Sequence, residues 1–421
     1  MLDLKFIREN PDLVKANLRN RGSKFNLEEL LFLDKQKREK AAELDNLRMK
    51  KNKANDDITL ILKQKKDPKD AIAQMKSIAE EIDRLELEVK ALEDKLKQQL
   101  LRIPNICHSS IPVGDATSNK IVRYNGQIRK FDFSPRNHIE LSEHLDIMDL
   151  PRAAKITGSN FVVFKGDGAR LQRALIDFML DLHTKKHGYK EIWPPSLVNR
   201  SSMTGTAQLP NLEEDMYRLK DDDLFLIPTA EVPLTNLLRD EILEEERLPI
   251  YYTAYTPCFR REAGSYGKDT KGLMRVHQFD KVEMVKFVKP ESSYDELEKL
   301  VANAEEVLQL LEIPYRVNLL ATADISFAAS KCYDLEAYAP GLDRWLEVSS
   351  CSNFEDFQAR RANIRYRRKD KKLSFVHTLN GSGVALARTV IAIIENYQNK
   401  DGSIQIPVVL RRYFDGQERI G

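Results

Sequence analysis

Cysteine is scarce in this sequence. Its four cysteines, Cys107, Cys258, Cys332 and Cys351, are spread over 421 residues. No two of them have CxxC spacing, and Cys107 and His108 are too close together to be part of a zinc-binding pattern. The pattern indicates reduced thiols, so we expect neither a disulfide framework nor a zinc site.

Long apolar runs and a strong net charge are also missing. No run approaches the roughly 18 residues of a membrane-spanning helix, and the first residues, MLDLKFIRENPD, lack the apolar segment of a signal peptide. The net charge is only +2, so any nucleic-acid surface must be local. We expect a cytoplasmic protein without membrane contact, and a chain of 421 residues predicts two or more domains.

Two nucleotide-binding signatures are absent as well. Neither a GxxxxGK[ST] phosphate loop nor a dinucleotide-type GxGxxG occurs, and Gly166-Asp167-Gly168 is better explained as a turn between a strand and a helix. The strand and helix alternation of a Rossmann fold is missing too. These absences argue against a P-loop enzyme and a Rossmann-type nucleotide-binding domain.

The first hundred residues contain long helix-forming segments. Residues 26–66 and 69–102 have no glycine, and Asp67-Pro68 lies between them. Apolar residues recur at alternating spacings of three and four, among them Leu30, Leu33, Leu44, Leu47, Ile58 and Ile61 in the first segment and Ile72, Met75, Ile82, Val89 and Leu96 in the second. Such seams predict an antiparallel coiled-coil hairpin of two helices.

A helix stop follows this hairpin. Ile103-Pro104-Asn105 ends the second helix, and a loop-rich stretch comes after it. We therefore expect a helical domain at 1–103 and a second domain at 104–421.

Basic residues are concentrated on the first long segment. They include Lys35, Lys37, Lys40, Lys50, Lys51, Lys53, Lys63, Lys65 and Lys66. Lysines on a coiled coil are often plain solvated surface. In a nearly neutral chain the concentration also favours binding of a phosphate backbone by shape and charge.

Residues 255–288 predict a β-hairpin that carries charged and aromatic side chains. Two alternating stretches flank a glycine-rich basic loop. Arg260 and Glu262 lie two residues apart, as do side chains on one face of a strand, and Phe279 and Glu283 would share a face of the returning strand. This set suits a ligand with phosphate, amine and base. The alternative is a surface hairpin with ion pairs.

The hairpin resembles motif 2 of the class II aminoacyl-tRNA synthetases, in the form carried by seryl-tRNA synthetases. The family pattern is FRxEAGS, a basic loop, HQF and a carboxylate. The matching residues here are Phe259-Arg260-Arg261-Glu262-Ala263-Gly264-Ser265, His277-Gln278-Phe279 and Glu283. Lys268 and Lys271 stand where many relatives have Arg, which keeps the charge and loses bidentate geometry.

Other segments are similar to the same family. They are residues 188–195 (GYKEIWPP, motif 1), residues 204–210 (TGTAQLP, with Ala207 for the family's Gly), residues 229–236 (TAEVPLTN), residues 347–353 (EVSSCSN) and residues 380–388 (NGSGVALAR, motif 3). Taken singly, each has a plainer explanation: an edge strand, a helix cap at Thr229, a polar rim at Glu347 and Ser350, or a helical surface charge at Arg388. We also expect the serines of 347–353 to form a turn after a strand, and Gly-Ser-Gly to form a turn that lets the backbone approach a ligand.

The resemblance implies a fold class and a set of site residues. The fold would be α+β: an antiparallel β-sheet class II synthetase catalytic domain flanked by helices, with an N-terminal antiparallel two-helix coiled-coil arm that binds tRNA. Arg260 and Arg388 would carry the catalysis, and Glu347 and Ser350 would hold Mg²⁺. The residues implied for ATP are Arg260, Arg261, Glu262, Phe279, Glu347, Val348, Ser349, Ser350 and Arg388, and those for serine are Thr229, Ala230, Glu231, Glu283, Asn380 and Ser382.

The implied activity is a ligase that uses ATP to join L-serine to tRNA(Ser), and also to tRNA(Sec), as a homodimer. The short stretch after Arg388 leaves no room for the C-terminal anticodon-binding domain of threonyl, prolyl, glycyl and histidyl enzymes, which favours serine. Two rivals remain open. One is a ligase that loads an amino acid onto a carrier protein, and the other is a coiled-coil scaffold with an inactive synthetase body.

Overall fold

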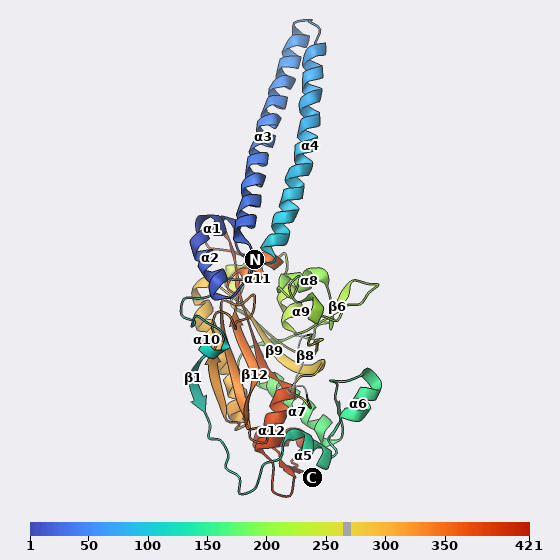
Figure 1. Ribbon diagram of the computed structural model, residues 1–421, viewed down its shortest axis with the longest axis vertical. Coiled ribbons are helices and arrows are strands. Elements are labelled where there is room, and N and C mark those ends of the chain that lie inside the picture. The colour runs from blue at the N-terminus through green and yellow to red at the C-terminus, as the bar shows by residue number, and fades with distance from the viewer. Residues whose placement is uncertain (264–270) are drawn as a thin grey trace. The chain divides into compact units, whose positions relative to one another are not determined.

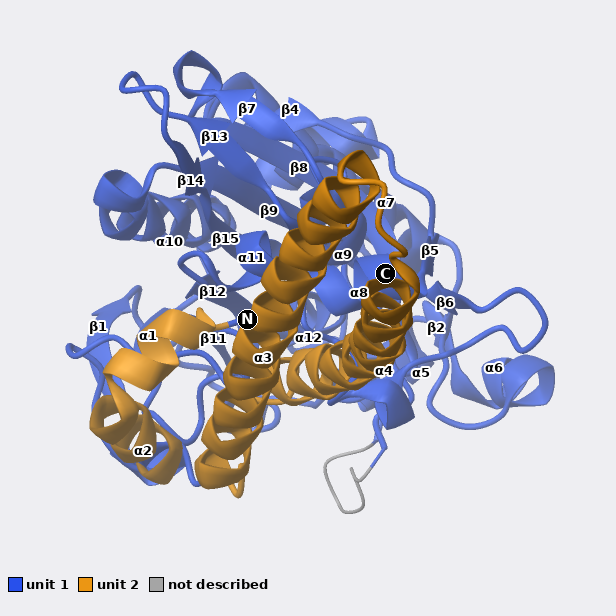
Figure 2. Cartoon of the chain, turned by 90° about the horizontal axis from the view of Figure 1, so that it is seen from above, with its two compact units in different colours: residues 1, 20–22, 104–421 blue, residues 2–19, 23–103 orange. Residues whose placement is uncertain are grey.

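The computed structural model describes residues 1–263 and 271–421 (Figure 1). Gly264, Ser265 and Lys268 of the predicted motif 2 loop lie outside the described residues. Contacts divide the chain into two units, one formed by residues 2–19 and 23–103 and the other by residues 1, 20–22 and 104–421 (Figure 2). Among the described residues, no helix has the length and apolar character to cross a membrane.

The unit of residues 2–19 and 23–103 is helical. Its helices are α1 (Leu4–Glu9), α2 (Pro11–Asn20), α3 (Leu27–Lys63) and α4 (Lys69–Leu100). The long helices α3 and α4 lie side by side (Figure 1), and a buried cluster of Leu44, Leu47, Ile82 and Leu85 holds them together. The predicted antiparallel two-helix arm is therefore confirmed.

The charges of this arm fall into two groups. Near its base, ion pairs cross from α3 to α4, joining Lys37 to Glu93 at 3.0 Å and Arg48 to Glu86 at 2.8 Å. Within the described contacts, exposed lysines nearer the turn have no ion pair; they are Lys50, Lys53, Lys63, Lys65 and Lys66. The paired cations stabilise the hairpin, while the others are available to a ligand.

An eight-stranded sheet is the framework of the other unit. In spatial order its strands are β1 (Lys120–Asn125), β10 (Tyr315–Leu319), β11 (Lys331–Ala339), β12 (Arg344–Asn353), β15 (His377–Ala385), β9 (Gln278–Val288), β8 (Ile250–Phe259) and β4 (Lys190–Glu191). All neighbours are antiparallel except β4 and β8, which are parallel. The predicted antiparallel α+β architecture is confirmed.

The longest helices that pack against this sheet are α7 (Asp167–Lys185), α10 (Ser293–Leu310) and α12 (Leu386–Asn396), and the shorter α9 (Glu231–Asn236) and α11 (Phe357–Ala362) also contact it. Each of the three longest helices buries an apolar stripe. The remaining helices are α5 (His138–His144), α6 (Leu150–Thr157) and α8 (Arg200–Gly205). The remaining strands are β2 (Met148–Asp149), β3 (Val163–Phe164), β5 (Leu197–Asn199), β6 (Leu224–Leu226), β7 (Ile242–Glu244), β13 (Arg365–Arg367), β14 (Leu373–Phe375), β16 (Ile404–Gln405) and β17 (Arg419–Ile420).

Two predicted turns belong instead to strands. The EVSSCSN residues lie within β12, and Gly381-Ser382-Gly383 lies within β15. The two glycines allow close packing, because a Cβ on Gly381 would lie 2.8 Å from the Cys351 sulfur and one on Gly383 would lie 2.6 Å from His183 Nε2. The prediction that these glycines form a turn was wrong, because they continue β15.

Candidate active site

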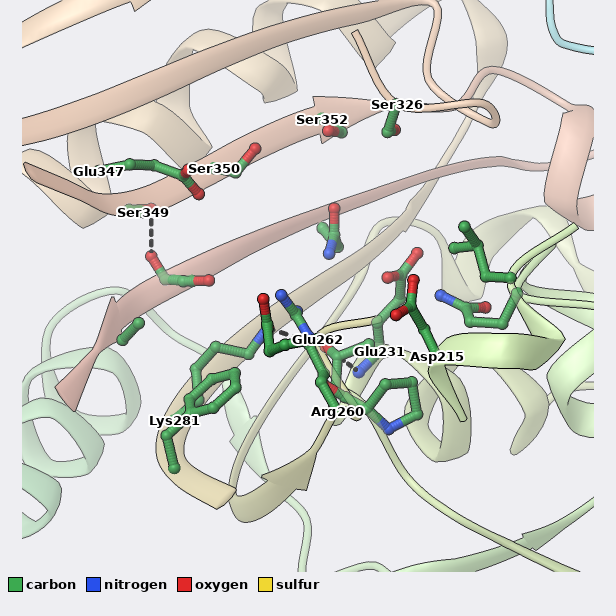
Figure 3. A pocket seen from close by; sticks show the side chains of 18 of the residues that line it. Asp215, Glu231, Arg260, Glu262, Lys281, Ser326, Glu347, Ser349, Ser350 and Ser352 are labelled. Carbon is green, nitrogen blue, oxygen red and sulfur yellow. Dashed lines mark hydrogen bonds between the residues drawn. The ribbon is translucent and has the colours of Figure 1, made fainter. Parts of the chain in front are cut away.

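A cavity of about 550 Å³ lies where four neighbouring strands of the sheet come together. Because β12, β15, β9 and β8 are adjacent in the sheet, residues far apart in the sequence meet there. Figure 3 shows Glu347, Ser350 and Ser352 along one strand, across from Arg260 and Glu262. The predicted site residues that line the cavity are Thr229, Glu231, Arg260, Glu262, Phe279, Glu347, Val348, Ser349, Ser350, Asn380, Ser382 and Arg388.

Three predicted site residues are not part of this lining. Ala230 is fully buried in the core beside α9, and Arg261 is exposed, with its backbone N–H donating to the Asp215 carbonyl at 2.9 Å. Glu283 is buried behind the cavity wall and accepts a hydrogen bond from Asn380 Nδ2 at 2.8 Å. Of the three, only Glu283 is bonded to a lining residue through its side chain.

Arg260 and Glu262 reach the cavity by a different route from the one predicted. β8 ends at Phe259, and Glu262 has a φ of 50°, in the left-handed region, so the two residues do not share a strand face. The Arg260 guanidinium lies 5.2 Å from the centroid of the Phe279 ring. A flat cation and an aromatic ring thus stand together on one wall, which suits a phosphate next to a base.

The other predicted cation is Arg388, in the first turn of α12. Its Nη1 lies 3.3 Å from Glu347 Oε2 and donates to the Glu347 carbonyl at 2.9 Å. Similarly, Glu262 Oε2 accepts from Arg275 Nη1 at 3.0 Å. Both carboxylates can therefore exchange a protein partner for a ligand group.

The predicted serine residues surround a lysine that the sequence analysis missed. The Nζ atom of Lys281, a buried residue, lies 2.5 Å from Glu283 Oε2 and donates to Thr229 Oγ1 at 2.9 Å. An ammonium group is thus already held by one hydroxyl and one carboxylate of the predicted serine set. The sequence did contain a signal for Lys281, because a spacing of two residues places it on the same face of β9 as Phe279 and Glu283.

Glu231 is the second buried carboxylate on this side. Burial, and next the negative charge of Glu283, raise its pKa to about 7, although Gln358 Nε2 donates to it at 2.6 Å and favours the ionised form. No local pattern in the sequence marks Gln358 as a partner, since it approaches from α11. The site thus holds a carboxyl group that can change its charge when a cation binds.

Oxygen ligands for a cation gather at Glu347 and Ser350. Asp334 of β11 is the register partner of Ser350, and burial together with the Glu347 charge raises its pKa well above the usual range. The Asp334 carboxyl, which feels the charge of Glu347 and is hydrogen-bonded to Ser350, adds a further oxygen ligand for a hard cation such as Mg²⁺. The described residues contain no group of three or more His, Cys, Asp and Glu side chains placed to hold a metal, so phosphate oxygens would have to complete the shell.

Two family models match the chain. Residues 215–397 match the tRNA synthetase class II core domain (G, H, P, S and T), and residues 1–107 match the seryl-tRNA synthetase N-terminal domain. The fold and the site therefore define a class II aminoacyl-tRNA synthetase.

Full-length relatives identify the branch of this class. A serine–tRNA ligase of Carboxydothermus hydrogenoformans is 54% identical, with 100% of this chain and 99% of the relative covered, and one of Trichlorobacter lovleyi is 55% identical, with 100% of both chains covered. A crystal structure of seryl-tRNA synthetase from Pyrococcus horikoshii complexed with ATP has a TM-score of 0.95 at 41% identity and covers 100% of this chain and 99% of that one. The chain belongs to the seryl-tRNA synthetases and is a serine–tRNA ligase.

Proposed function

We propose that the cavity between β8, β9, β12 and β15 is where this chain activates serine with ATP. The serine carboxylate oxygen attacks the α-phosphorus, the bond from this phosphorus to the bridging oxygen breaks, and pyrophosphate leaves. A hydroxyl of the terminal tRNA ribose then attacks the seryl carbonyl carbon, and AMP leaves. The observation that carries the proposal is that three guanidinium groups, those of Arg260, Arg275 and Arg388, and several carboxylates line one cavity.

Positioning and charge account for the catalysis, because neither step requires a protein nucleophile. Arg260 binds the α-phosphate, and the adenine stacks on Phe279 beside it, with Glu262 near its amino group. Arg388 leaves Glu347 to bind the terminal phosphate. Val348 and Ser349 complete the nucleotide wall, and Arg261 acts from the rim. Glu347 and Ser350 would hold Mg²⁺, which would supply positive charge next to the triphosphate.

The serine side uses the buried polar groups. Thr229, Ala230 and Glu231 hold the amino end, and Glu283, Asn380 and Ser382 contact the rest of the amino acid. Alanine leaves these buried groups unpaired, so it is rejected strongly, by about 10⁴-fold or more. Threonine is rejected by size.

The partners follow from the same family. The arm at 1–103 binds tRNA(Ser) as a separate domain, the body at 104–421 carries the chemistry, and the chain works in the cytoplasm as a homodimer. We extend the range to tRNA(Sec). An M. kandleri seryl-tRNA synthetase has been solved in complex with tRNASec and, at 19% identity and a TM-score of 0.59 over 80% of this chain, it shares the fold.

The test is serine-dependent exchange of labelled pyrophosphate into ATP. Arg260→Ala and Arg388→Ala each remove a cation that meets charge in the transition state, so exchange falls on the order of 10²- to 10³-fold. Arg247→Ala, at an exposed arginine of the same unit, serves as the matched control. Undiminished exchange in correctly folded Arg260→Ala and Arg388→Ala proteins means that the chemistry lies elsewhere.

A further inference from the structure

Glu395, near the end of α12, is a fully buried carboxylate outside the cavity. One oxygen accepts from the His138 backbone N–H at 2.9 Å and lies 3.1 Å from His138 Nδ1. The other accepts from the backbone N–H groups of Gly341 and Leu342, at 2.8 and 3.1 Å. These four contacts satisfy the carboxylate without any cation from Lys or Arg.

The partners of Glu395 belong to elements that carry the site. α12 begins with the turn that holds Arg388, and Gly341 and Leu342 form the connection into β12, which carries Glu347 and Ser350. The buried Glu395 carboxylate therefore fixes α12, which carries Arg388, against β12, which carries Glu347 and Ser350.

His138 extends this link to a third element. Because the Glu395 oxygen accepts, Nδ1 of His138 carries the ring proton and Nε2 is left as an acceptor. Nε2 receives the backbone N–H of Leu273 at 3.4 Å. The neighbouring Gly272 has a φ of +68°, and a Cβ there would lie 2.3 Å from Nε2, so the backbone lies directly against the ring.

The segment held in this way forms part of the cavity. Leu273, Met274, Arg275 and Val276 all line it, and they lead directly into β9. Arg275 also carries the ion pair to Glu262. A shift of the Leu273 backbone would therefore move several groups that face the nucleotide.

We propose that His138 is a positioning residue of the ATP site. Held by Glu395, its ring fixes the backbone at Leu273 and so sets the wall formed by residues 273–276 relative to Arg388 and Glu347. The proposal rests on the proposed function, because it takes this wall to be the ATP side of the cavity.

Two substitutions separate the two ring nitrogens. In His138→Asn the amide nitrogen can replace Nδ1, which keeps the bond to Glu395 and loses the acceptor for Leu273. In His138→Gln the amide oxygen can replace Nε2, which keeps the acceptor for Leu273. His144→Asn, at an exposed histidine of the same helix, is the matched control.

The measurement is pyrophosphate exchange by the full chain, with ATP and serine varied separately. We expect His138→Asn to raise the KM for ATP about threefold to tenfold, the equivalent of one lost hydrogen bond, while the KM for serine stays within twofold. His138→Gln should recover most of the ATP affinity. Hydrogen exchange of the Leu273 amide should be faster in His138→Asn and close to the original in His138→Gln.

Several outcomes overturn the inference. One is an unchanged KM for ATP in His138→Asn with a lower melting temperature, which marks a purely structural histidine. Another is an equal rise of both KM values in both variants. If Arg260→Ala and Arg388→Ala abolish exchange in the same assay, the site itself stands and only the role of His138 is lost. If either variant misfolds, the Leu273 amide exchange of the other still decides.

Discussion

At the scale of single residues, the serine side of the cavity combines two buried carboxylates with one buried ammonium. The charge of Glu283 disfavours ionisation of Glu231, and Lys281 pairs directly with Glu283. Lys281 also favours the ionised form of Glu231, but burial and the charge of Glu283 outweigh it and raise the pKa of Glu231. A substrate ammonium therefore enters a site where Glu231 gains from becoming ionised.

This charge balance predicts a pH-dependent affinity for serine. The pKa of Glu231 is raised to about 7, so below that pH the carboxyl is neutral and holds an ammonium weakly. Serine should bind roughly tenfold more tightly at pH 8 than at pH 6, with release of a proton on binding. Calorimetry without ATP, in two buffers of different ionisation enthalpy, measures both effects.

Glu231→Gln is the control for this titration. The amide cannot ionise, so the pH dependence and the proton release between pH 6 and 8 should disappear. The same substitution tests stability, because a raised folded pKa means that the contribution of Glu231 is full below 4.5 and is lost as the pH rises through about 7. If the original chain binds serine equally well at pH 6 and pH 8, the role of Glu231 is refuted.

Ala207 is a second residue whose environment makes a prediction. It lines the cavity, is almost fully buried and has a φ of 72°, a left-handed conformation that disfavours a Cβ. Glycine, the residue of the family pattern, relieves this strain. Ala207→Gly should stabilise the chain by roughly 0.5–1 kcal/mol, after the greater freedom of glycine in the unfolded chain is counted.

Denaturant unfolding followed by circular dichroism checks this prediction. The matched control is Ala154→Gly, at an exposed position within α6, where the same change should destabilise by about 0.5–1 kcal/mol. The opposite signs separate the effect of backbone conformation from the effect of glycine itself. Destabilisation by Ala207→Gly contradicts the argument from strain.

At the scale of elements, long periodic segments could be predicted from the sequence. The seams of α3 and α4 and the alternation of β9 identify both kinds of element, because each depends on spacing within one segment. Short elements could not be predicted in this way. β3 (Val163–Phe164) and β16 (Ile404–Gln405) have two residues each, too few for an alternating pattern to be recognised.

The candidate site shows the same division. Residues inside recognisable motifs, such as Arg260 and Glu347, line the cavity as predicted, whereas Gln358 and Asp334 meet the site through the packing of α11 and β11. Local spacing cannot reveal these tertiary neighbours. The same holds for the glycines of motif 3. They are required because α7 and Cys351 pack closely against β15, and local spacing does not show this packing.

The charge distribution of the coiled-coil arm leads to the third prediction. Lys63, Lys65 and Lys66, next to the turn, are exposed and carry no ion pair within the described contacts. If they bind tRNA phosphates, replacing all three by Gln should raise the KM for tRNA at least tenfold. The salt dependence of binding should weaken by about 0.7–0.9 log units per lost phosphate contact.

Aminoacylation assays over a range of salt concentrations test this, with pyrophosphate exchange as the internal control for the body. The matched variant is Lys35→Gln, Lys37→Gln and Lys40→Gln, whose lysines form ion pairs within the arm. This variant should lower the stability of the hairpin, while the salt dependence of tRNA binding should stay nearly the same. Equal salt slopes in the original chain and the variant with three changes near the turn place the tRNA contact elsewhere.

At the scale of the whole molecule, the sheet has one edge at β4, which follows α7 and, among the described strands, pairs only with β8. The outer side of an edge strand presents unpaired backbone groups. Trp193, two residues after β4, is 78% exposed and touches Tyr255 edge to face, with ring centroids 6.0 Å apart. A large exposed aromatic beside an open edge is typical of a surface that a second copy of the chain covers.

This surface gives the last prediction, that Trp193→Glu weakens a homodimer formed through motif 1. In a two-fold dimer the change occurs twice, and burying a charge in place of an aromatic anchor costs at least about 2 kcal/mol, or roughly 30-fold in the dissociation constant. Sedimentation equilibrium measures it, with Leu87→Glu, at an exposed residue of α4, as the control. Contacts within one chain hold both the cavity and the arm, so the monomeric Trp193→Glu protein should keep its fold. If the Trp193→Glu dimer is unaltered, or if Leu87→Glu abolishes the dimer, the prediction that motif 1 forms the interface is wrong.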